Sequence, residues 1–340
     1  MTVPRPTRHV SVKDVAARSG VSFQTTSKVL NGKGSVSEVT RARILAAASD
    51  LGYVPNLQAR SLVMKSTRAV GLVGSDFSDP NLSRFIVGAE REARRQGYAV
   101  MITSVEPAGS VGEYALPAMM ERRVDGILLA APQIQEDRAA AQALKGTVPV
   151  VSLHEVAGGG VATVDSDHEL TGLLATRHLA GKGHRVIAVI TGTPGRVTEG
   201  RLRGYKKALA EASLPFDAEL VEAGRWEIDG AAQATTRLLE RRPDITAIFA
   251  QNDVMAMGAL NALARLGKRV PEDCAVAGCD DIDMAAYTVP PLTTVHVPFY
   301  EIGKEAMRLL LSMIGDGAGE PRRVLLPVHL VVRASSGGAR

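Results

Sequence analysis

Side chains that could bind a nucleic acid gather between residues 22 and 31. This stretch carries an aromatic ring, a bidentate amide, several hydroxyls and an ammonium group. An amide can pair with a base edge in the DNA major groove, and an ammonium group can bind a base or a phosphate. These residue types predict a DNA-binding surface, and an ordinary amphipathic surface helix is the alternative for this stretch alone. The set comprises Ser22, Phe23, Gln24, Thr25, Ser27, Lys28 and Asn31.

Two short helices joined by a turn should position these side chains. In the first helix Val12, Val15 and Ala16 form one apolar face, and Gly20 supplies the turn. Ser22 is the expected N-cap of the second helix, because its hydroxyl can accept a free backbone N–H. At 100° per residue the second helix has an outward arc of Phe23, Gln24, Ser27 and Lys28, opposite an inward arc of Thr25, Thr26, Val29 and Leu30.

A third helix is expected from about Ser37 to Leu51, with Gly52 at its end. Its apolar residues Ile44, Ala47, Ala48 and Leu51 recur at helical spacing. Three helices within some forty residues predict a helix-turn-helix unit, preceded by a basic arm at residues 1–10.

Charge is distributed unevenly along the 340 residues. The formal net charge is +4, yet residues 1–68 hold eleven Lys or Arg and only three acidic residues. This first segment therefore carries +8 and the remainder −4. A small basic segment on a mildly acidic remainder indicates a polyanionic partner for the first segment only.

Apolar runs alternate with amphipathic segments from residue 69 to about residue 335. Such runs predict buried parallel strands with helices on both faces of a sheet. The pattern occurs once before about Ser152 and again from Asp167, which predicts two doubly wound α/β subdomains with a ligand cleft at the carboxyl ends of their strands. The runs are residues 69–73, 99–103, 126–131, 148–152, 186–190, 246–250 and 275–279.

Three polar residues of this part each follow an apolar run and could converge on one cleft: Arg201, Asn252 and Asp280. A guanidinium, an amide and a carboxylate together can bind adjacent hydroxyls of a polyol. Trp226, the only tryptophan, could stack on a sugar face. The alternatives are a solvated charge for Arg201, a helix cap for Asn252, an acidic turn for Asp280 and a core position for Trp226.

Enzyme and metal-site patterns are not found in the sequence. No GxGxxG follows a strand, no Walker pattern occurs, and the seven histidines show no metal-ligand spacing. Cys274 and Cys279 are expected to be buried free thiols. We therefore expect no enzymatic activity, no cofactor and no metal. Without an apolar leader or a membrane-length stretch, a cytoplasmic location is expected.

The run from Val12 to Leu62 resembles the headpiece and hinge of the lactose/galactose repressor (LacI/GalR-type) family of bacterial transcription regulators. The resemblance continues in the segments GRLRGY at residues 200–205, QND at 251–253, GCDD at 278–281 and PPLTTV at 290–295. It implies a helix-turn-helix DNA-binding headpiece at residues 1–55 and a hinge helix and linker at 56–68. Residues 69–335 would then form a ligand-binding and dimerisation core of two subdomains with the periplasmic-binding-protein fold.

The resemblance assigns roles to individual residues. Phe23, Gln24 and Lys28 would read the operator, and Leu62 would insert into the minor groove at its centre. The family commonly has arginine where this chain has Lys28, and lysine lacks the planar fork that grips guanine. Residues 56–62 are too short to persist as an isolated helix, so we expect operator DNA to order them. The other hinge residues assigned to DNA are Asn56, Ala59 and Arg60.

On the ligand side, the resemblance places Arg201 in contact with the effector. His154 stands where many members have an aspartate, and residues 79–82 (DPNL) stand where many have Asn-Pro-Phe-Phe. Because both changes lie in one wall of the predicted cleft, the ligand could differ from a plain hexose. The full ligand-binding set is Asp76, Phe77, His154, Arg201, Trp226, Asn252 and Asp280.

The expected function is a ligand-responsive DNA-binding transcriptional regulator, and specifically a repressor. It would bind a palindromic operator as a homodimer, with its affinity switched by a sugar or sugar derivative in the cleft. The alternative is a co-repressor-dependent regulator that binds a non-sugar ligand such as a nucleobase. The ten residues after Leu330 are too few for tetramerising heptads, so a dimer is expected rather than a tetramer.

Overall fold

The computed structural model describes residues 10–32, 35–54, 66–75, 77, 79–105, 115–131, 148–156, 159–317 and 321–337. The chain divides into two compact units, Met1–Thr67 and Arg68–Arg340. Some of the predicted site residues lie outside the described residues, namely Asp76 and the four hinge residues Asn56, Ala59, Arg60 and Leu62.

The first unit is a three-helix bundle of α1 (Val12–Ser19), α2 (Phe23–Leu30) and α3 (Glu38–Asp50). Each helix begins at a serine whose side chain accepts a backbone N–H of the first turn: Ser11, Ser22 and Ser37. Gly20 ends α1 with φ 65°, a left-handed conformation that glycine adopts without a steric penalty. The three predicted helices are thus confirmed, and their common core consists of Val15, Val29, Ile44, Ala47 and Ala48.

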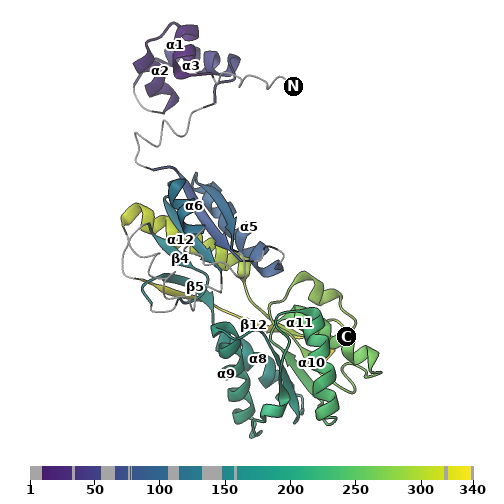
Figure 1. The fold of residues 1–340 in the computed structure, drawn as a ribbon. Helices are drawn as coiled ribbons and strands as arrows, with labels where there is room; N and C mark the ends of the chain where they lie inside the picture. Colours follow the sequence, from purple (N-terminus) through teal and green to yellow (C-terminus); the bar gives the residue numbers. More distant parts are fainter. Residues whose placement is uncertain are drawn as a thin grey trace, which may run out of the picture. The chain divides into compact units, whose positions relative to one another are not determined.

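The second unit contains two subdomains, each built on a parallel sheet (Figure 1). The first sheet has the order β11-β5-β4-β3-β1-β2. Its strands are β1 (Ala69–Gly74), β2 (Ala99–Ser104), β3 (Gly126–Ala130), β4 (Val150–Ser152), β5 (Ala162–Ser166) and β11 (Arg323–Leu326), and its helices are α5 (Pro80–Arg95), α6 (Ala115–Glu121) and α12 (Phe299–Asp316).

The second sheet has the order β7-β6-β8-β9. Its strands are β6 (Ile187–Thr191), β7 (Val221–Ala223), β8 (Ala247–Ala250) and β9 (Ala275–Ala277), and its helices are α8 (His168–Gly181), α9 (Arg196–Glu211), α10 (Ile228–Arg241) and α11 (Asp253–Arg265). An antiparallel pair accompanies it, β10 (Thr294–His296) and β12 (His329–Val331). Three short 3₁₀ segments complete the described structure: η2 (Ala218–Leu220), η3 (Asp283–Tyr287) and η4 (Ala334–Ser336).

Every predicted apolar run overlaps a strand, but the prediction of two successive halves needs a correction. The C-terminal elements α12 and β11 return to the first subdomain, and Figure 1 shows α12 in yellow beside β4 rather than among the green helices α10 and α11. Glycines permit this return, because a Cβ at Gly303 of α12 would lie 2.0 Å from the carbonyl oxygen of Phe85 on α5. The strand β2, expected to be buried, is a partly exposed edge strand.

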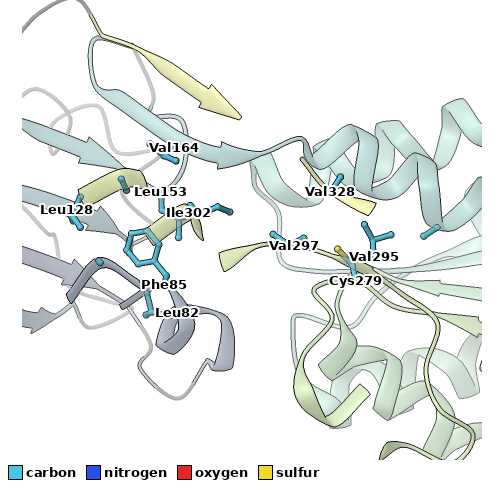
Figure 2. Packing of buried hydrophobic residues seen from close by; sticks show 14 of the residues in the cluster. Leu82, Phe85, Leu128, Leu153, Val164, Cys279, Val295, Val297, Ile302 and Val328 are labelled. Carbon is cyan, nitrogen blue, oxygen red and sulfur yellow. The ribbon is translucent and has the colours of Figure 1, made fainter. Parts of the chain in front are cut away.

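One apolar cluster contributes side chains from both subdomains. Figure 2 shows Phe85, Leu128 and Ile302 near the first sheet, and Val295 and Cys279 near the second. The predicted burial of both cysteine thiols is confirmed, and each is free. Among the described helices, none combines the length and apolar character that crossing a bilayer requires.

Candidate nucleic-acid interface and effector site

In the first unit, α2 separates its two faces as the helical spacing predicts. Thr26 and Val29 are buried in the bundle, whereas Gln24 and Lys28 are not. Phe23 is 50% exposed, so its ring lies on the outward side of the helix. The outward face therefore offers a ring, an amide and an ammonium group on one short helix, as a major-groove reader requires.

The remaining polar residues of this stretch make local bonds that hold the helix ends. The backbone N–H of Thr25 donates to Ser22 Oγ at 3.3 Å, and that hydroxyl donates to Thr25 Oγ1 at 2.9 Å. At the other end Asn31 Nδ2 donates to the carbonyl oxygen of Ser27 at 2.8 Å. These bonds shape the helix from which Gln24 and Lys28 project.

In the second unit, tight packing of α8 against α9 positions Arg201. A Cβ at Gly172 of α8 would lie 2.0 Å from the carbonyl oxygen of Arg201, and a Cβ at Gly204 of α9 would lie 2.0 Å from that of Glu169. The two helix backbones therefore touch where only glycine fits. This contact fixes the depth at which the Arg201 side chain enters the subdomain.

Arg201 and Asp280 form a buried ion pair. Arg201 Nη2 lies 3.0 Å from Asp280 Oδ1, and Nη1 donates to the carbonyl oxygen of Gln251. Both residues are 3% exposed. The backbone of Asp280 has φ 114°, a strained value for a residue with a Cβ. Such strain is often found at functional sites, and here the bonds to the Asp280 carboxylate help to maintain it.

The first subdomain also contributes to this cluster. Asn81 Nδ2, on α5, donates to Asp280 Oδ2 at 2.7 Å. On the same helix Arg84 Nη1 donates to the carbonyl oxygen of Asp281 at 3.0 Å, and Nη2 pairs with Asp283. Two side chains of α5 therefore hold the segment that follows β9, and they connect the two subdomains.

Two buried polar atoms of the cluster have no hydrogen-bond partner among the described residues. They are the donor Arg201 Nε and the acceptor Asn81 Oδ1. Buried polar atoms without protein partners are rare, and such atoms commonly bind an ordered water or a ligand group. A hydroxyl can both donate and accept, so a hydroxylated ligand could satisfy both kinds of atom.

A second carboxyl lies behind this pair. Asp253 accepts a hydrogen bond from Thr294 Oγ1 at 2.5 Å and another from the backbone N–H of Ile282 at 2.9 Å. Burial, followed by the nearby charge of Asp280, raises the pKa of Asp253 to about 8. Burial likewise raises the pKa of Asp280, against the opposing effect of Arg201. The site thus holds two acidic groups and one guanidinium out of water.

The other predicted ligand residues are only partly brought together with this pair. The Trp226 ring centre lies 5.8 Å from Arg201 Cζ, and its Nε1 donates to Thr193 Oγ1 at 3.0 Å. Gly192 permits this position, since a Cβ there would lie 1.9 Å from the indole. Asn252 caps α11, because its Oδ1 accepts the N–H of Met255 at 2.8 Å. The helix-cap alternative therefore holds for that oxygen.

Two predicted residues lie in different surroundings. His154 faces Asp165, with Nδ1 3.4 Å from Oδ2, and Phe77 is 37% exposed in the segment after β1. The sequence interpretation also missed contributors to the cluster. Asn81 stood out only as part of a changed segment, and Gln251 only as the neighbour of Asn252. Nothing in the sequence pattern marks Arg84.

Comparison with known proteins gives matches over both units. Residues 11–56 match the family described as bacterial regulatory proteins, lacI family, and residues 176–336 match the periplasmic binding protein-like domain. The "HTH-type transcriptional repressor PurR" of Photobacterium profundum is 33% identical over 327 residues, covering 96% of this chain and 98% of that protein. The "HTH-type transcriptional regulator CelR" of Thermobifida fusca is 36% identical over 342 residues, with the same shares covered.

Solved structures agree with these matches. A crystal structure of the lac repressor dimer bound to operator and the anti-inducer ONPF superposes with a TM-score of 0.88 at 30% identity, covering 97% of this chain and 99% of that one. A CelR–cellobiose complex superposes with a TM-score of 0.74 at 34% identity, covering 96% and 100%. The expected fold class and family are thus confirmed, and the chain belongs to the lacI family of bacterial regulatory proteins, as a ligand-responsive DNA-binding transcriptional regulator.

Proposed function

We propose that this chain represses transcription as a homodimer on a palindromic operator and that a small molecule bound at the Arg201–Asp280 cluster changes its operator affinity. The observation that supports the effector site is a pair of buried atoms, Arg201 Nε and Asn81 Oδ1, that have no hydrogen-bond partner within the described part of the chain. They lie next to the Arg201–Asp280 ion pair, which joins distant parts of the sequence. Burying such groups costs free energy unless a ligand or water satisfies them.

A sugar or sugar derivative is the effector that this chemistry favours. Arg201 supplies donors, Asp280 supplies acceptors, and Asn81 adds an amide that can do both. The Trp226 indole gives a flat apolar surface on which a pyranose face could stack. The CelR relative was solved in complex with cellobiose, which supports a ligand of this class. A nucleobase is the alternative, since it could stack on the same indole.

The switch would act through the contacts of α5. Asn81 and Arg84 connect the first subdomain to the segment Asp280–Asp283 of the second. A ligand that bonds to both Asn81 Oδ1 and the Asp280 carboxylate contacts both subdomains, so the two subdomains should change their relative position when it binds. By thermodynamic linkage, the change in operator affinity can be no larger than the difference between the ligand's affinities for the two arrangements of the subdomains.

The DNA contacts would come from the outward face of α2, with the hinge set Asn56, Ala59, Arg60 and Leu62 added from the sequence. A single headpiece reads too few base pairs for specific binding, so two copies on a two-fold symmetric site are needed. Sedimentation analysis of the protein with and without operator tests this. The expected result is two chains per operator, and one chain per operator would contradict the homodimer.

The effector proposal is tested by a thermal-shift screen of the full-length protein against sugars, sugar acids, phosphosugars and nucleobases, followed by calorimetric titration of the best hit. Asn81→Ala and Asp280→Asn should weaken binding of that hit by at least tenfold, because each removes a polar partner of the ligand. Arg177→Ala is the matched control, since it breaks an exposed ion pair with Glu211 on the same subdomain. If Asn81→Ala and Asp280→Asn both bind the hit with wild-type affinity, the effector does not bind at the Arg201–Asp280 cluster.

A further inference from the structure

A second polar cluster lies where the chain passes from the first sheet to the second. His154 follows β4, Asp165 lies on β5, and His168 lies in the first turn of α8. Asp165 Oδ2 is 3.4 Å from His154 Nδ1 and 3.2 Å from His168 Nε2, and these three atoms all lie within 4.8 Å of one another. The three side chains are only 13%, 10% and 14% exposed.

The two N···O distances of this cluster fit a bound metal ion as well as they fit hydrogen bonds. Good N–H···O bonds have a mode of about 2.9 Å, and both N···O distances here are longer. A tetrahedral ion with bonds of about 2.0–2.1 Å separates its ligand atoms by about 3.3 Å, which lies between the two observed values. Two imidazoles and a carboxylate form a ligand set that first-row divalent ions such as Zn²⁺ accept.

The surrounding structure holds the ligands in place. The other carboxylate oxygen, Asp165 Oδ1, accepts the backbone N–H of Ser166 at 2.7 Å, which leaves Oδ2 directed at the two imidazoles. Helix α9 packs closely against His168, because a Cβ at Gly200 would lie 2.7 Å from the Cβ of His168. Contacts that orient ligands from outside are a regular feature of metal sites.

Two buried polar atoms in this segment have unused hydrogen-bonding capacity. Two buried atoms here, His168 Nδ1 and Ser166 Oγ, have no hydrogen-bond partner among the residues that the structure describes. They are available to ordered water beside the cluster.

We propose that His154 Nδ1, Asp165 Oδ2 and His168 Nε2 bind one divalent transition-metal ion of the Zn²⁺ class. Three protein ligands leave a fourth position for water or for an oxygen of another molecule. The ion would connect the loop after β4 and the strand β5 to the start of α8, and so link the two subdomains. The spacing of histidines along the sequence did not reveal this set, since residues 154 and 168 meet only through the pairing of β4 with β5.

The test is calorimetric titration of the chelator-treated full-length protein with Zn²⁺ alone. We expect one high-affinity ion per chain, and His154→Ala and His168→Ala should each weaken its binding by at least tenfold. His184→Ala is the matched control, because that ring bonds to Thr246 in another part of the same subdomain and its loss should leave the affinity unchanged. Co²⁺ should give the visible absorption of a tetrahedral site in wild type and in His184→Ala, but not in His168→Ala.

Folding defects are separated from ligand loss by far-UV circular dichroism and by thermal unfolding without metal. His154→Gln is the second variant, since it keeps a polar side chain in a partly exposed loop and should fold. Zn²⁺ should raise the unfolding temperature of wild type and not that of His154→Gln. The proposal is overturned if wild type binds no Zn²⁺ under these conditions, or if the folded cluster variants bind it as tightly as wild type.

Discussion

The two candidate binding surfaces of this protein differ in how their polar side chains are held. On α2 the side chains of Gln24 and Lys28 project from a helix whose ends are fixed by local bonds. At the second site Arg201 and Asp280 are buried and bonded to each other across 79 positions of sequence. The first surface is ready for a large partner that brings its own charges. The second is a closed polar cluster, in which a small ligand must replace existing contacts.

This difference predicts where mutations will be costly. Removing an exposed polar group changes the stability of the protein little, because water already satisfies that group. A buried charge that loses its partner keeps its full desolvation penalty. Mutations of α2 should therefore change binding without changing stability, and mutations of the buried pair should change both.

The largest expected effect is that of Arg201→Ala. It leaves the Asp280 carboxylate buried without its guanidinium, so the free energy of unfolding should fall by about 3–5 kcal/mol. Arg177→Ala breaks the exposed pair with Glu211 and should cost less than about 1 kcal/mol. Urea unfolding of both variants measures the contrast. Equal losses would show that burial does not decide the stability contribution of these pairs.

Gln24→Ala should have the next largest effect, and on operator binding alone. Loss of an amide that pairs with a base edge should cost about 1–3 kcal/mol per half-site and relax the preference at one position. Lys28→Ala should instead flatten the salt dependence of binding if its partner is a phosphate. Selection of binding sites from a random pool, with unfolding curves as control, separates the two. If Gln24→Ala keeps wild-type specificity, Gln24 does not read a base of the operator.

A dependence of stability on pH is also expected, and it arises from Asp253. Because burial raises its pKa to about 8 in the folded state, the folded protein holds this proton more tightly than the unfolded chain. Its contribution to stability is therefore fully present below the ordinary carboxyl pKa and falls as the pH rises towards 8, by at most about 1.4 kcal/mol per pH unit. Asp253→Asn should remove that decline. Thermal unfolding of wild type and Asp253→Asn between about pH 5 and pH 8 is the measurement, and parallel curves would contradict the assignment.

The sequence alone predicted the elements that rest on short-range patterns. The three helices of the headpiece follow from the Ser22 cap, Gly20 and apolar residues at helical spacing, and the structure confirms them. The apolar runs located seven strands, because burial on both sides of a sheet leaves a continuous apolar signature. The edge strand β2 has the same signature although it is partly exposed. Short strands such as β7 and β12 lack that signature, and the sequence did not reveal them.

Contacts between distant residues were decided by the tertiary structure. Arg201 and Asp280 were correctly expected to converge, but their closed pairing and the bond from Asn81 depend on how α5, α9 and the segment after β9 pack. The return of α12 and β11 to the first sheet and the meeting of His154 with His168 depend on strand pairing across long separations. Helix periodicity and caps are properties of neighbouring residues, so a sequence displays them directly. The partner of a buried charge is set by chain topology, which no local pattern encodes.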